Sequence, residues 1–264
     1  MPADPERGTA YGPRIGVVIP TLNEARTLPA LLERLLAQPG ASPGGRASLD
    51  LPDEIVVVDG NSHDGTCQLA REAGVRVMQG PRCRGSQLAL GARELATDVL
   101  LFLHADAIPE PGALQVLRQT YGDPQVQWTA MAQSIDAPGR VYRMIESAAN
   151  ARARRGRVFG DSGLAVRREL YRAVGGFANL PVFEDVELSQ RLRRKAAVRW
   201  VQGACLSVSA RRWESEGWLS CTLRNWMLRI GFRLGVAPTQ LAHWYAPHSD
   251  RSGPGGRPGR AQGA

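Results

Sequence analysis

His104 and Asp106 directly follow an apolar run, 100–103, of the kind expected for a strand buried on both faces. Open α/β sheets bind ligands beyond the carboxyl ends of their strands, so an imidazole and a carboxylate placed there suit a metal or phosphate site. The structural alternative is that Asp106 caps the helix expected over 109–119 and that His104 is an ordinary loop residue. The loops after the other strands help to decide between these two interpretations.

Two further expected strands also end in polar loops. Strand 15–19 is followed by a proline and several polar side chains, and strand 54–58 by an acidic loop that contains glycine. Glycine lets the backbone approach a ligand, and Ser62 or Asp64 could cap the following helix. Because parallel strands end at one edge of a sheet, we expect these side chains to converge. The residues predicted at this edge are Pro20, Thr21, Asn23, Glu24, Asp59, Asn61, Asp64, Ala105 and Asp106.

Glu184 and Asp185 form an acidic pair at the start of a helix expected over 185–194, and we take them as the candidate catalytic residues. A positioned carboxylate can take a proton from a hydroxyl that becomes a nucleophile. The structural alternative, stabilisation of a helix start by its macrodipole, is compatible with catalysis. The same dipole predicts an ordinary or lowered pKa for Asp185, which would keep it ionised at neutral pH.

Four segments occur in order along the chain: IPTLNE at 19–24, VVVDGNSHDGT at 56–66, FLHAD at 102–106 and FEDVELSQRLRR at 183–194. On these segments the chain resembles the family 2 glycosyltransferases of the GT-A fold, over about residues 14–245. It is most similar to a short soluble bacterial branch whose metal motif reads HAD and precedes a GD…G…RR segment, here 160–168. The resemblance implies the GT-A fold and glycosyl transfer, and it carries no information about the sugar.

The resemblance implies an inverting transfer from a nucleoside-diphosphate sugar, expected to be UDP-linked, assisted by a divalent metal, Mn²⁺ or Mg²⁺. It assigns the loop 20–24 and Asp59 to the nucleoside, Asp106 to a metal on the diphosphate, and Asp185 to the general base. The sequence departs from the family at His104, which stands where the first aspartate of the DxD motif is expected. A neutral imidazole suits Mn²⁺ better than Mg²⁺, so the identity of the metal stays open.

Basic and polar side chains that suit the leaving diphosphate follow the third expected strand. Related enzymes keep an arginine there, a role that either Arg82 or Arg84 could fill, and we place Arg84 and Gln87 in the donor site. A second basic cluster, 152–157, would form either a mobile lid over the phosphates or a solvated charged surface. Arg157 and Asp161 are the residues that we place at the acceptor or lid.

The alternation of strands and helices in the first half predicts an α/β fold with a mostly parallel central sheet and helices on both faces. With 264 residues, 43% of them hydrophobic, the chain can bury a sizeable core. We expect one domain over 14–245, ending in an amphipathic helical segment over 218–245, between disordered tails at 1–13 and 249–264. The expected strands are 15–19, 54–58, 76–78, 99–103, 126–134, 164–167, 198–201 and 206–209. The expected helices are 25–37, 66–73, 86–95, 112–121, 140–152, 168–174, 185–194 and 218–234.

The helix expected over 218–234 carries an apolar stripe on one face. We expect this stripe to pack on the sheet domain, with a peripheral membrane contact as the alternative. The net charge of +8 is not accompanied by an aromatic-interleaved basic stripe, so no nucleic-acid partner is expected. Scattered cysteines and the lack of a signal-peptide pattern predict a cytoplasmic protein. The stripe comprises Leu219, Leu223, Trp226, Met227, Ile230 and Leu234.

Two other functions would share a nucleotide site at this sheet edge. A sugar nucleotidyltransferase should carry a glycine-rich loop with a lysine after the first strand, and the loop 20–24 has neither. A non-catalytic sugar-nucleotide-binding protein would keep Asp59 and Asp106 without needing Asp185. The QxxRW motif of processive synthases is missing because Ala196 stands where its glutamine is required, which favours transfer of a single sugar. The acceptor (a lipid carrier, a small-molecule alcohol or a glycan) and the oligomeric state stay open.

Overall fold

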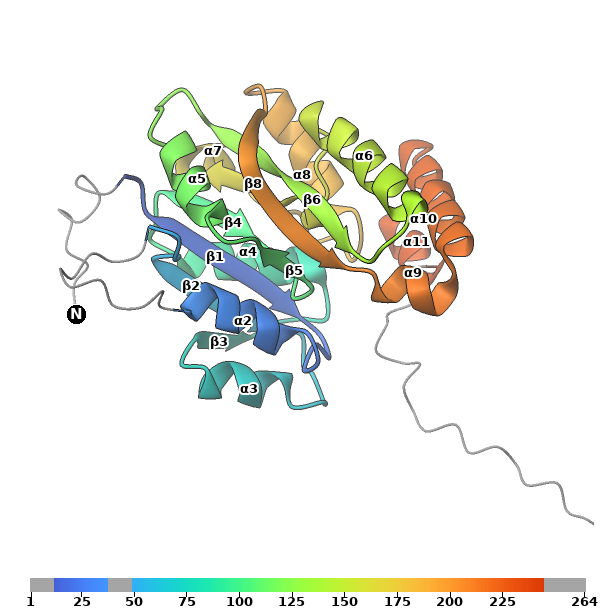
Figure 1. The fold of residues 1–264 in the computed structure, drawn as a ribbon, viewed down its shortest axis with the longest axis horizontal. Coiled ribbons are helices and arrows are strands. Elements are labelled where there is room, and N and C mark those ends of the chain that lie inside the picture. The colour runs from blue at the N-terminus through green and yellow to red at the C-terminus, as the bar shows by residue number, and fades with distance from the viewer. Residues whose placement is uncertain (1–11, 38–48, 245–264) are drawn as a thin grey trace, which may run out of the picture.

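The computed structural model describes residues 12–37 and 49–244, and the first half of the chain forms four neighbouring parallel strands (Figure 1). These strands are β1 (Ile15–Thr21), β2 (Glu54–Asp59), β3 (Arg76–Gln79) and β4 (Val99–Phe102). The helices between them are α2 (Leu28–Leu36), α3 (Thr66–Glu72) and α4 (Arg84–Glu94). The predicted tails lie outside the described residues, except for residues 12 and 13.

The second half of the chain extends the same sheet. β7 (Ala165–Arg167) lies between β4 and β6 (Trp128–Asp136), antiparallel to both, and β6 runs parallel to β8 (Arg199–Ser209). At the edge, β5 (Ala107–Pro109) pairs antiparallel with β8, which gives the order β3-β2-β1-β4-β7-β6-β8-β5. The accompanying elements are α5 (Ala113–Thr120), α6 (Arg140–Arg154), the 3-10 turn η1 (Gly160–Ser162), α7 (Arg168–Ala173) and α8 (Glu184–Arg193).

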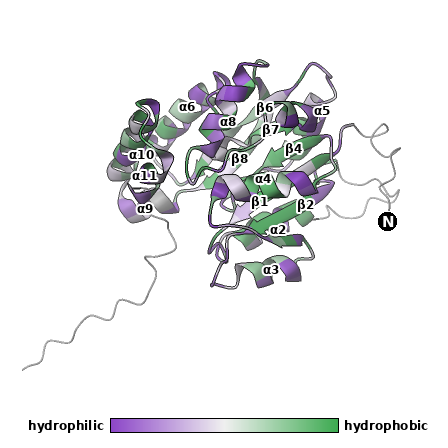
Figure 2. Ribbon diagram, turned by 180° about the vertical axis from the view of Figure 1, so that it is seen from behind, coloured by the Kyte–Doolittle hydropathy of each residue, from purple (hydrophilic) through white to green (hydrophobic). Residues whose placement is uncertain are grey.

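Hydrophobic side chains form one core on each face of the sheet. On β1, Val17 packs in the core under α2 and α5, whereas Val18 packs in the core under α4 and α8. On β4, Leu101 and Leu100 divide in the same way, because successive side chains of a strand point to opposite faces. Burial on both faces explains the continuous apolar runs of these strands (Figure 2). The predicted α/β fold, with a mostly parallel sheet and helices on both faces, is confirmed.

β8 is a single strand, although the sequence predicted two strands at 198–201 and 206–209. Met131 of β6 pairs with Val201, and the next residue, Ala132, pairs with Cys205, so residues 202–204 bulge out of the ladder. Gly203 lies in this bulge with a φ of +86°, a conformation that favours glycine. The gap in the predicted pattern is therefore a β-bulge within one strand.

Three helices follow β8, where the sequence predicted one segment over 218–245. They are α9 (Arg211–Glu216), α10 (Trp218–Arg233) and α11 (Pro238–Trp244). α10 ends because Gly235 adopts a φ of +87° and the Val236 N–H donates to the Gly231 carbonyl, which forms a C-terminal cap. Within the described ranges, every helix is too short or too polar to cross a membrane.

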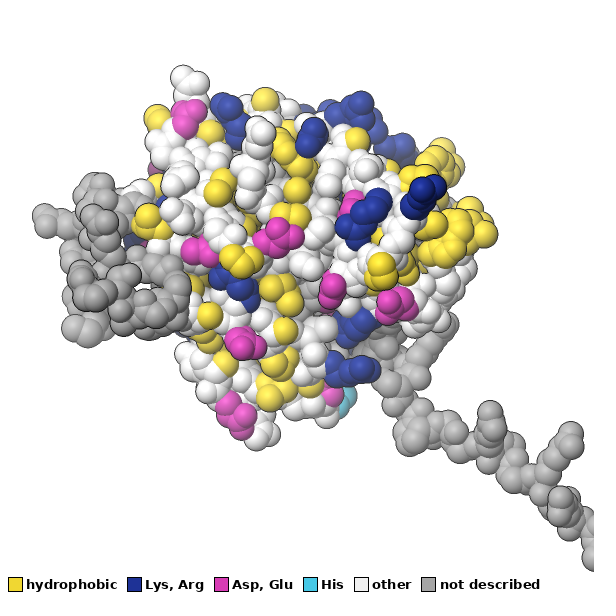
Figure 3. Space-filling model, in the orientation of Figure 1, with side chains coloured by type: hydrophobic (Ala, Val, Ile, Leu, Met, Phe, Trp, Pro, Cys, Tyr) yellow, Lys and Arg dark blue, Asp and Glu magenta, His cyan; other side chains and the backbone are white. Residues whose placement is uncertain are grey.

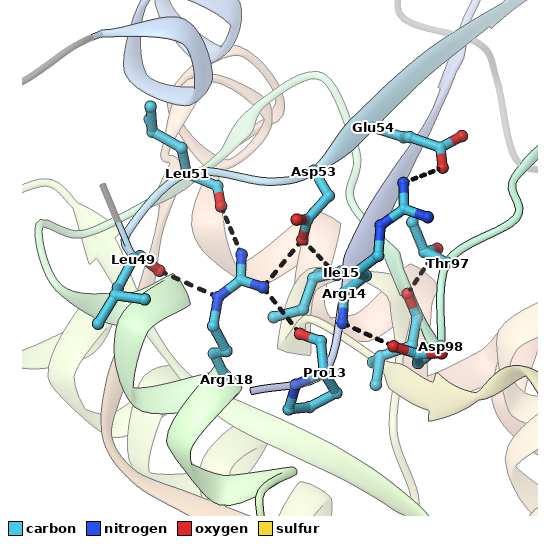
Figure 4. Close-up of polar contacts among 11 residues, drawn as sticks. Pro13, Arg14, Ile15, Leu49, Leu51, Asp53, Glu54, Thr97, Asp98 and Arg118 are labelled. Atoms are coloured by element: carbon cyan, nitrogen blue, oxygen red, sulfur yellow. Dashed lines mark hydrogen bonds and ion pairs between the residues drawn. The ribbon is translucent and has the colours of Figure 1, made fainter. Parts of the chain in front are cut away.

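Polar contacts tie the start of β1 and the start of β2 to α5, at the edge of the sheet away from the polar loops. Figure 4 shows that Arg118 donates to the carbonyls of Pro13 and Leu51, at 2.7 and 2.8 Å, and pairs with Asp53 at 2.9 Å. Asp53 also accepts the Ile15 N–H at 2.7 Å. Because the buried guanidinium is both paired and hydrogen-bonded, it anchors the strand starts rather than serving a ligand.

Candidate active site

A cleft of about 1480 Å³ opens beyond the carboxyl ends of β1 and β4 and is bounded by α9 and α10. It brings together most of the residues predicted from the sequence, in agreement with the convergence of parallel strand ends. Those that line it are Pro20, Thr21, Asn23, Glu24, Asp64, Arg84, Gln87, His104, Ala105, Asp106, Asp161 and Asp185. Those that do not are Asp59, Asn61, Glu184 and Arg157.

The loops after β1 and β2 are joined by hydrogen bonds across the cleft floor. The Asn23 N–H donates to Ser62 Oγ at 2.8 Å, and Asn23 Oδ1 accepts the His63 N–H at 2.9 Å. The Ala25 N–H donates to an Asp64 oxygen at 3.0 Å. Asn23 has a φ of 56°, a left-handed conformation that asparagine tolerates better than most residues. These contacts hold both loops in one arrangement before any ligand binds.

Asp59 lies beneath this floor rather than in the cleft. It is fully buried and accepts hydrogen bonds from Thr21 Oγ1 at 3.0 Å and from the Ser62 N–H at 2.8 Å. Burial alone would raise the pKa of Asp59, but the hydrogen bonds from Ser62, Cys67 and Thr21 outweigh it and lower the pKa. Asp59 therefore shapes the floor as an ionised acceptor, and its contact with a nucleoside stays a prediction.

The carboxylates of Glu24 and Asp106 face Arg211 of α9. Its Nη2 atom lies 3.7 Å from a Glu24 oxygen and 3.9 Å from an Asp106 oxygen. Burial raises the pKa of Glu24 and the Asp106 charge adds to the rise, while a hydrogen bond from Thr27 and the charge of Arg211 oppose it. Arg211 was not among the residues predicted from the sequence, although a basic residue two positions after the last strand was an available signal.

The turn η1 connects His104 to Asp185. The His104 ring packs so closely on Gly160 that a β-carbon at this position would overlap the ring. The Gly160 N–H donates to Asp185 Oδ2 at 2.6 Å. One glycine thus joins the residue predicted for the metal to the residue predicted for the base.

Replacing Gly160 with alanine should therefore destabilise the fold by about 1–3 kcal/mol, because the His104 ring must leave its place. The same replacement in a His104→Ala background should cost much less, since the overlapping ring is gone. Urea unfolding of the two single variants and the double variant measures this coupling. An equal cost of Gly160→Ala in both backgrounds would contradict the contact.

Glu184 is fully buried behind the cleft wall and forms a bidentate ion pair with Arg84 through Nε and Nη2 of the guanidinium. Burial raises the pKa of Glu184 to about 7, although Arg84 lowers it. The Arg84 side chain is 27% exposed and lines the cleft. The contact of Arg84 with a diphosphate stays a prediction, whereas its ion pair with Glu184 is present in the structure.

Asp185 lies at the cleft surface with 5% of its area exposed. Its second carboxylate oxygen, Oδ1, accepts the Val186 N–H at 2.6 Å. Burial raises the pKa of Asp185, and this effect exceeds the lowering by Arg84 and by the N–H groups of Gly160 and Val186. The predicted ordinary or lowered pKa is therefore wrong, because burial outweighs the favourable helix start.

The residue before the acidic pair has a strained backbone. Phe183 has a φ of 62°, in the left-handed region that bulky residues rarely adopt. Its ring packs against Phe232 of α10, with the ring centroids 5.0 Å apart. Such strain persists where the surroundings enforce it, and here it precedes Glu184, the first residue of α8.

The basic cluster 152–157 does not line the cleft, so its predicted role as a lid stays a prediction. Arg157 is exposed, whereas Arg152 lies 3.9 Å from the centroid of the Phe159 ring. Burial lowers the pKa of Arg152 to about 10. Arg229 of α10 lies 4.8 Å from the same ring and lines the cleft together with Phe159. Neither Phe159 nor Arg229 belongs to a pattern that the sequence reveals.

A metal would have to be held by few protein ligands. Within residues 12–37 and 49–244, no three His, Cys, Asp or Glu side chains are grouped closely enough to form a metal site. In phosphate sites, however, Mg²⁺ uses one or two carboxylates, and substrate phosphates complete its shell. Asp106 and His104, which both line the cleft, fit such a partial donor set.

Open α/β sheets bind ligands beyond the carboxyl ends of their parallel strands, and the cleft of this chain lies there. The sequence matches Glycosyl transferase family 2 over residues 16–173, more than half of the chain, and the chain belongs to this family. It is 29% identical over 145 residues to the 4,4'-diaponeurosporenoate glycosyltransferase of Staphylococcus haemolyticus, a match that covers 52% of this chain. The match spans only 36% of that relative's length.

Solved structures share the fold at low sequence identity. A mannosyltransferase from Pyrobaculum calidifontis, in complex with GDP-Man and Mn²⁺, is 20% identical with a TM-score of 0.60, covering 90% of this chain and 70% of that chain. Glucosyl-3-phosphoglycerate synthase from Mycobacterium tuberculosis, in complex with Mn²⁺, UDP and phosphoglyceric acid, is 21% identical with a TM-score of 0.55, covering 85% and 80%. These likenesses confirm the predicted GT-A fold.

Proposed function

We propose that this chain is an inverting glycosyltransferase that moves a single sugar from a UDP-linked donor to an acceptor hydroxyl. The observation that carries the proposal is that Asp106 and Asp185 line one cleft at the carboxyl ends of the parallel strands. Family membership supports the reaction class. A non-catalytic sugar-nucleotide-binding protein would need the first carboxylate without the second.

In the proposed reaction Asp185 takes the proton of the acceptor hydroxyl, whose oxygen attacks the anomeric carbon of the sugar. The bond from that carbon to the diphosphate breaks on the opposite side, and the nucleoside diphosphate leaves. The configuration at the anomeric carbon of the transferred sugar is thereby inverted. The leaving group gains negative charge, so cationic groups near it lower the barrier. Arg211 and Arg229 line the cleft, and in this proposal they supply part of this charge.

We further propose that Asp106 and His104 hold a divalent ion on the donor diphosphate. When bound, such an ion would neutralise charge on the leaving group as a Lewis acid. The carboxylates of Glu24 and Asp106 give this part of the cleft the negative charge that a divalent ion requires, and Arg211 offsets only part of it. Mn²⁺ is present in both solved structures described above, which supports Mn²⁺ as the divalent ion of this proposal.

The nucleotide and the acceptor are the finer parts of the proposal. One solved relative binds GDP-Man and another binds UDP, so UDP and GDP are the two nucleotides to compare. A ligand that binds only the native state raises the melting temperature, and a larger rise with UDP than with GDP would support the proposed donor. The acceptor is an alcohol on a lipid carrier, a small molecule or a glycan.

Replacing Asp106 with asparagine should weaken Mn²⁺-dependent UDP binding at least about tenfold, since even partners behind a metal ligand change affinity that much. The fold should be unaffected, because the side chain is 36% exposed at a strand end. Calorimetric titration of UDP, with and without Mn²⁺, measures the effect.

Asp98→Asn is a matched control for this titration. Asp98 accepts the Arg14 N–H at 2.8 Å near the start of β4, away from the cleft, so its removal should leave UDP affinity unchanged. Unchanged affinity in Asp106→Asn would refute the donor assignment, and a loss only in the presence of Mn²⁺ would support the metal.

A further inference from the structure

The outer face of α10 exposes large apolar side chains. Leu223, Trp226 and Met227 are 56%, 61% and 57% exposed. The sequence predicted that this stripe packs on the sheet domain, and that prediction is wrong, because α10 packs through its opposite face, where Cys221 and Leu228 are buried. The exposed set, called here the outer α10 face, is Leu219, Leu223, Trp226, Met227, Ile230 and Leu234.

Basic side chains adjoin the outer α10 face. Figure 3 shows Lys and Arg side chains over α6 beside the hydrophobic side chains over α10. The two helices are linked through Phe159, since Arg152 of α6 and Arg229 of α10 both lie over its ring. The exposed arginines of α6 include Arg140, Arg143 and Arg154, and Arg233 is exposed on α10.

We propose that the outer α10 face binds the surface of an anionic lipid bilayer. A helix that presents tryptophan and leucine on one side, with arginines beside it, suits the boundary between acyl chains and anionic headgroups. A contiguous apolar face of this kind is unusual on a soluble monomer and indicates an interaction site. The inference is independent of the proposed transfer reaction.

Two other occupants fit less well. A second copy bound across a two-fold axis would bring the same arginine-rich borders against each other, which like charges oppose. The parts of the chain outside the described residues offer few apolar side chains for cover: in 1–11, 38–48 and 245–264 the only large ones are Met1, Tyr11 and Tyr245. An anionic bilayer, by contrast, complements both the apolar face and its basic border.

Co-sedimentation of the full chain with vesicles tests this proposal. We expect binding to phosphatidylcholine vesicles that contain phosphatidylglycerol, weaker binding to pure phosphatidylcholine, and a decrease as NaCl screens the charges. The double variant Trp226→Ser/Met227→Ser should bind the anionic vesicles about tenfold or more weakly, because it removes most of two apolar side chains from the contact. Leu36→Ser, at a residue 39% exposed on α2, is the matched control and should bind like the wild type.

The melting temperature of each variant separates loss of binding from loss of folding, and Leu234→Ser repeats the test at a residue 79% exposed. Absence of vesicle binding at low salt would overturn the proposal. Undiminished binding of folded variants would also overturn it, because the arginines alone would then account for the attraction. A dimer in analytical ultracentrifugation that the double variant converts to monomer, without vesicle binding, would assign the face to a second copy instead.

Discussion

Replacing Asp185 with asparagine is expected to lower kcat about 10²- to 10⁴-fold, the usual contribution of a positioned general base. Asparagine keeps the size of the side chain but cannot take the proton of the acceptor hydroxyl. The affinity for UDP should stay the same, because the proposed donor contacts come from the loops after β1, β2 and β4 and from the start of α4. Steady-state kinetics with a donor and acceptor found by screening, together with UDP titration, measure both quantities.

The pH dependence of the rate gives a second readout of the same residue. Because burial raises the pKa of Asp185, the rate should fall as the pH drops through a value above that of an ordinary aspartate, about 3.9. Asp185→Asn should lack this decrease. A wild-type rate that stays constant down to the ordinary value would contradict the assignment.

Two variants on the same helix complete the comparison. Glu187→Gln is the control, because Glu187 pairs with Arg191 along α8 and does not line the cleft. Glu184→Gln should reduce kcat less than Asp185→Asn. If Glu184→Gln lost the activity and Asp185→Asn kept it, the two roles would be reversed; if both stayed active, Asp161 would be the next candidate base.

Replacing Arg84 with methionine should reduce the free energy of unfolding by about 3–5 kcal/mol at pH 8, because it leaves Glu184 buried without its partner. The loss should shrink at pH 5, where Glu184 binds a proton. The pKa of Glu184 is raised to about 7 in the folded protein. The contribution of Glu184 to stability is therefore complete below its pKa in the unfolded chain, and it is lost as the pH rises through about 7. Urea unfolding at the two pH values measures the difference.

Two further variants control for this effect. Arg84→Met combined with Glu184→Met should recover most of the stability, because the uncompensated carboxylate is removed with its partner. Arg76→Met breaks an exposed ion pair with Glu94 and should change stability by only about 0–1 kcal/mol. A similar cost for Arg84→Met and Arg76→Met would contradict the buried pair.

The sequence predicted the parallel half of the sheet and the cleft residues at the ends of its strands. These were predictable because the end of a strand shows as a local pattern in the sequence. The apolar runs before Pro20 and His104 end where the chain leaves the sheet, and parallel strands must deliver these residues to one edge. The same reasoning placed Asp185 at a helix start. Its raised pKa escaped prediction because burial depends on elements distant in the sequence.

What the sequence did not show depends on long-range contacts. The salt bridge of Arg84 with Glu184 joins residues 100 positions apart, and no local pattern indicates it. The bulge at Gly203 divides one strand into two apparent segments, so β8 was predicted as a pair. The outer α10 face has the periodicity of a packed helix, and periodicity alone does not show which apolar face of a helix meets the core.

The position of β7 in the sheet has a consequence for biogenesis. β4 lies between β1 and β7 in the sheet, and Val99 of β4 pairs with Arg167 of β7. Because Arg167 is far along the chain, it is synthesised long after Val99. During synthesis β4 therefore remains an open edge, with unpaired backbone groups that invite pairing with other chains. A nascent chain that stops before residue 165 would carry the loops of the cleft floor on an unprotected sheet. We expect such truncated chains to aggregate, and chaperones to matter most while the middle third of the protein is being translated.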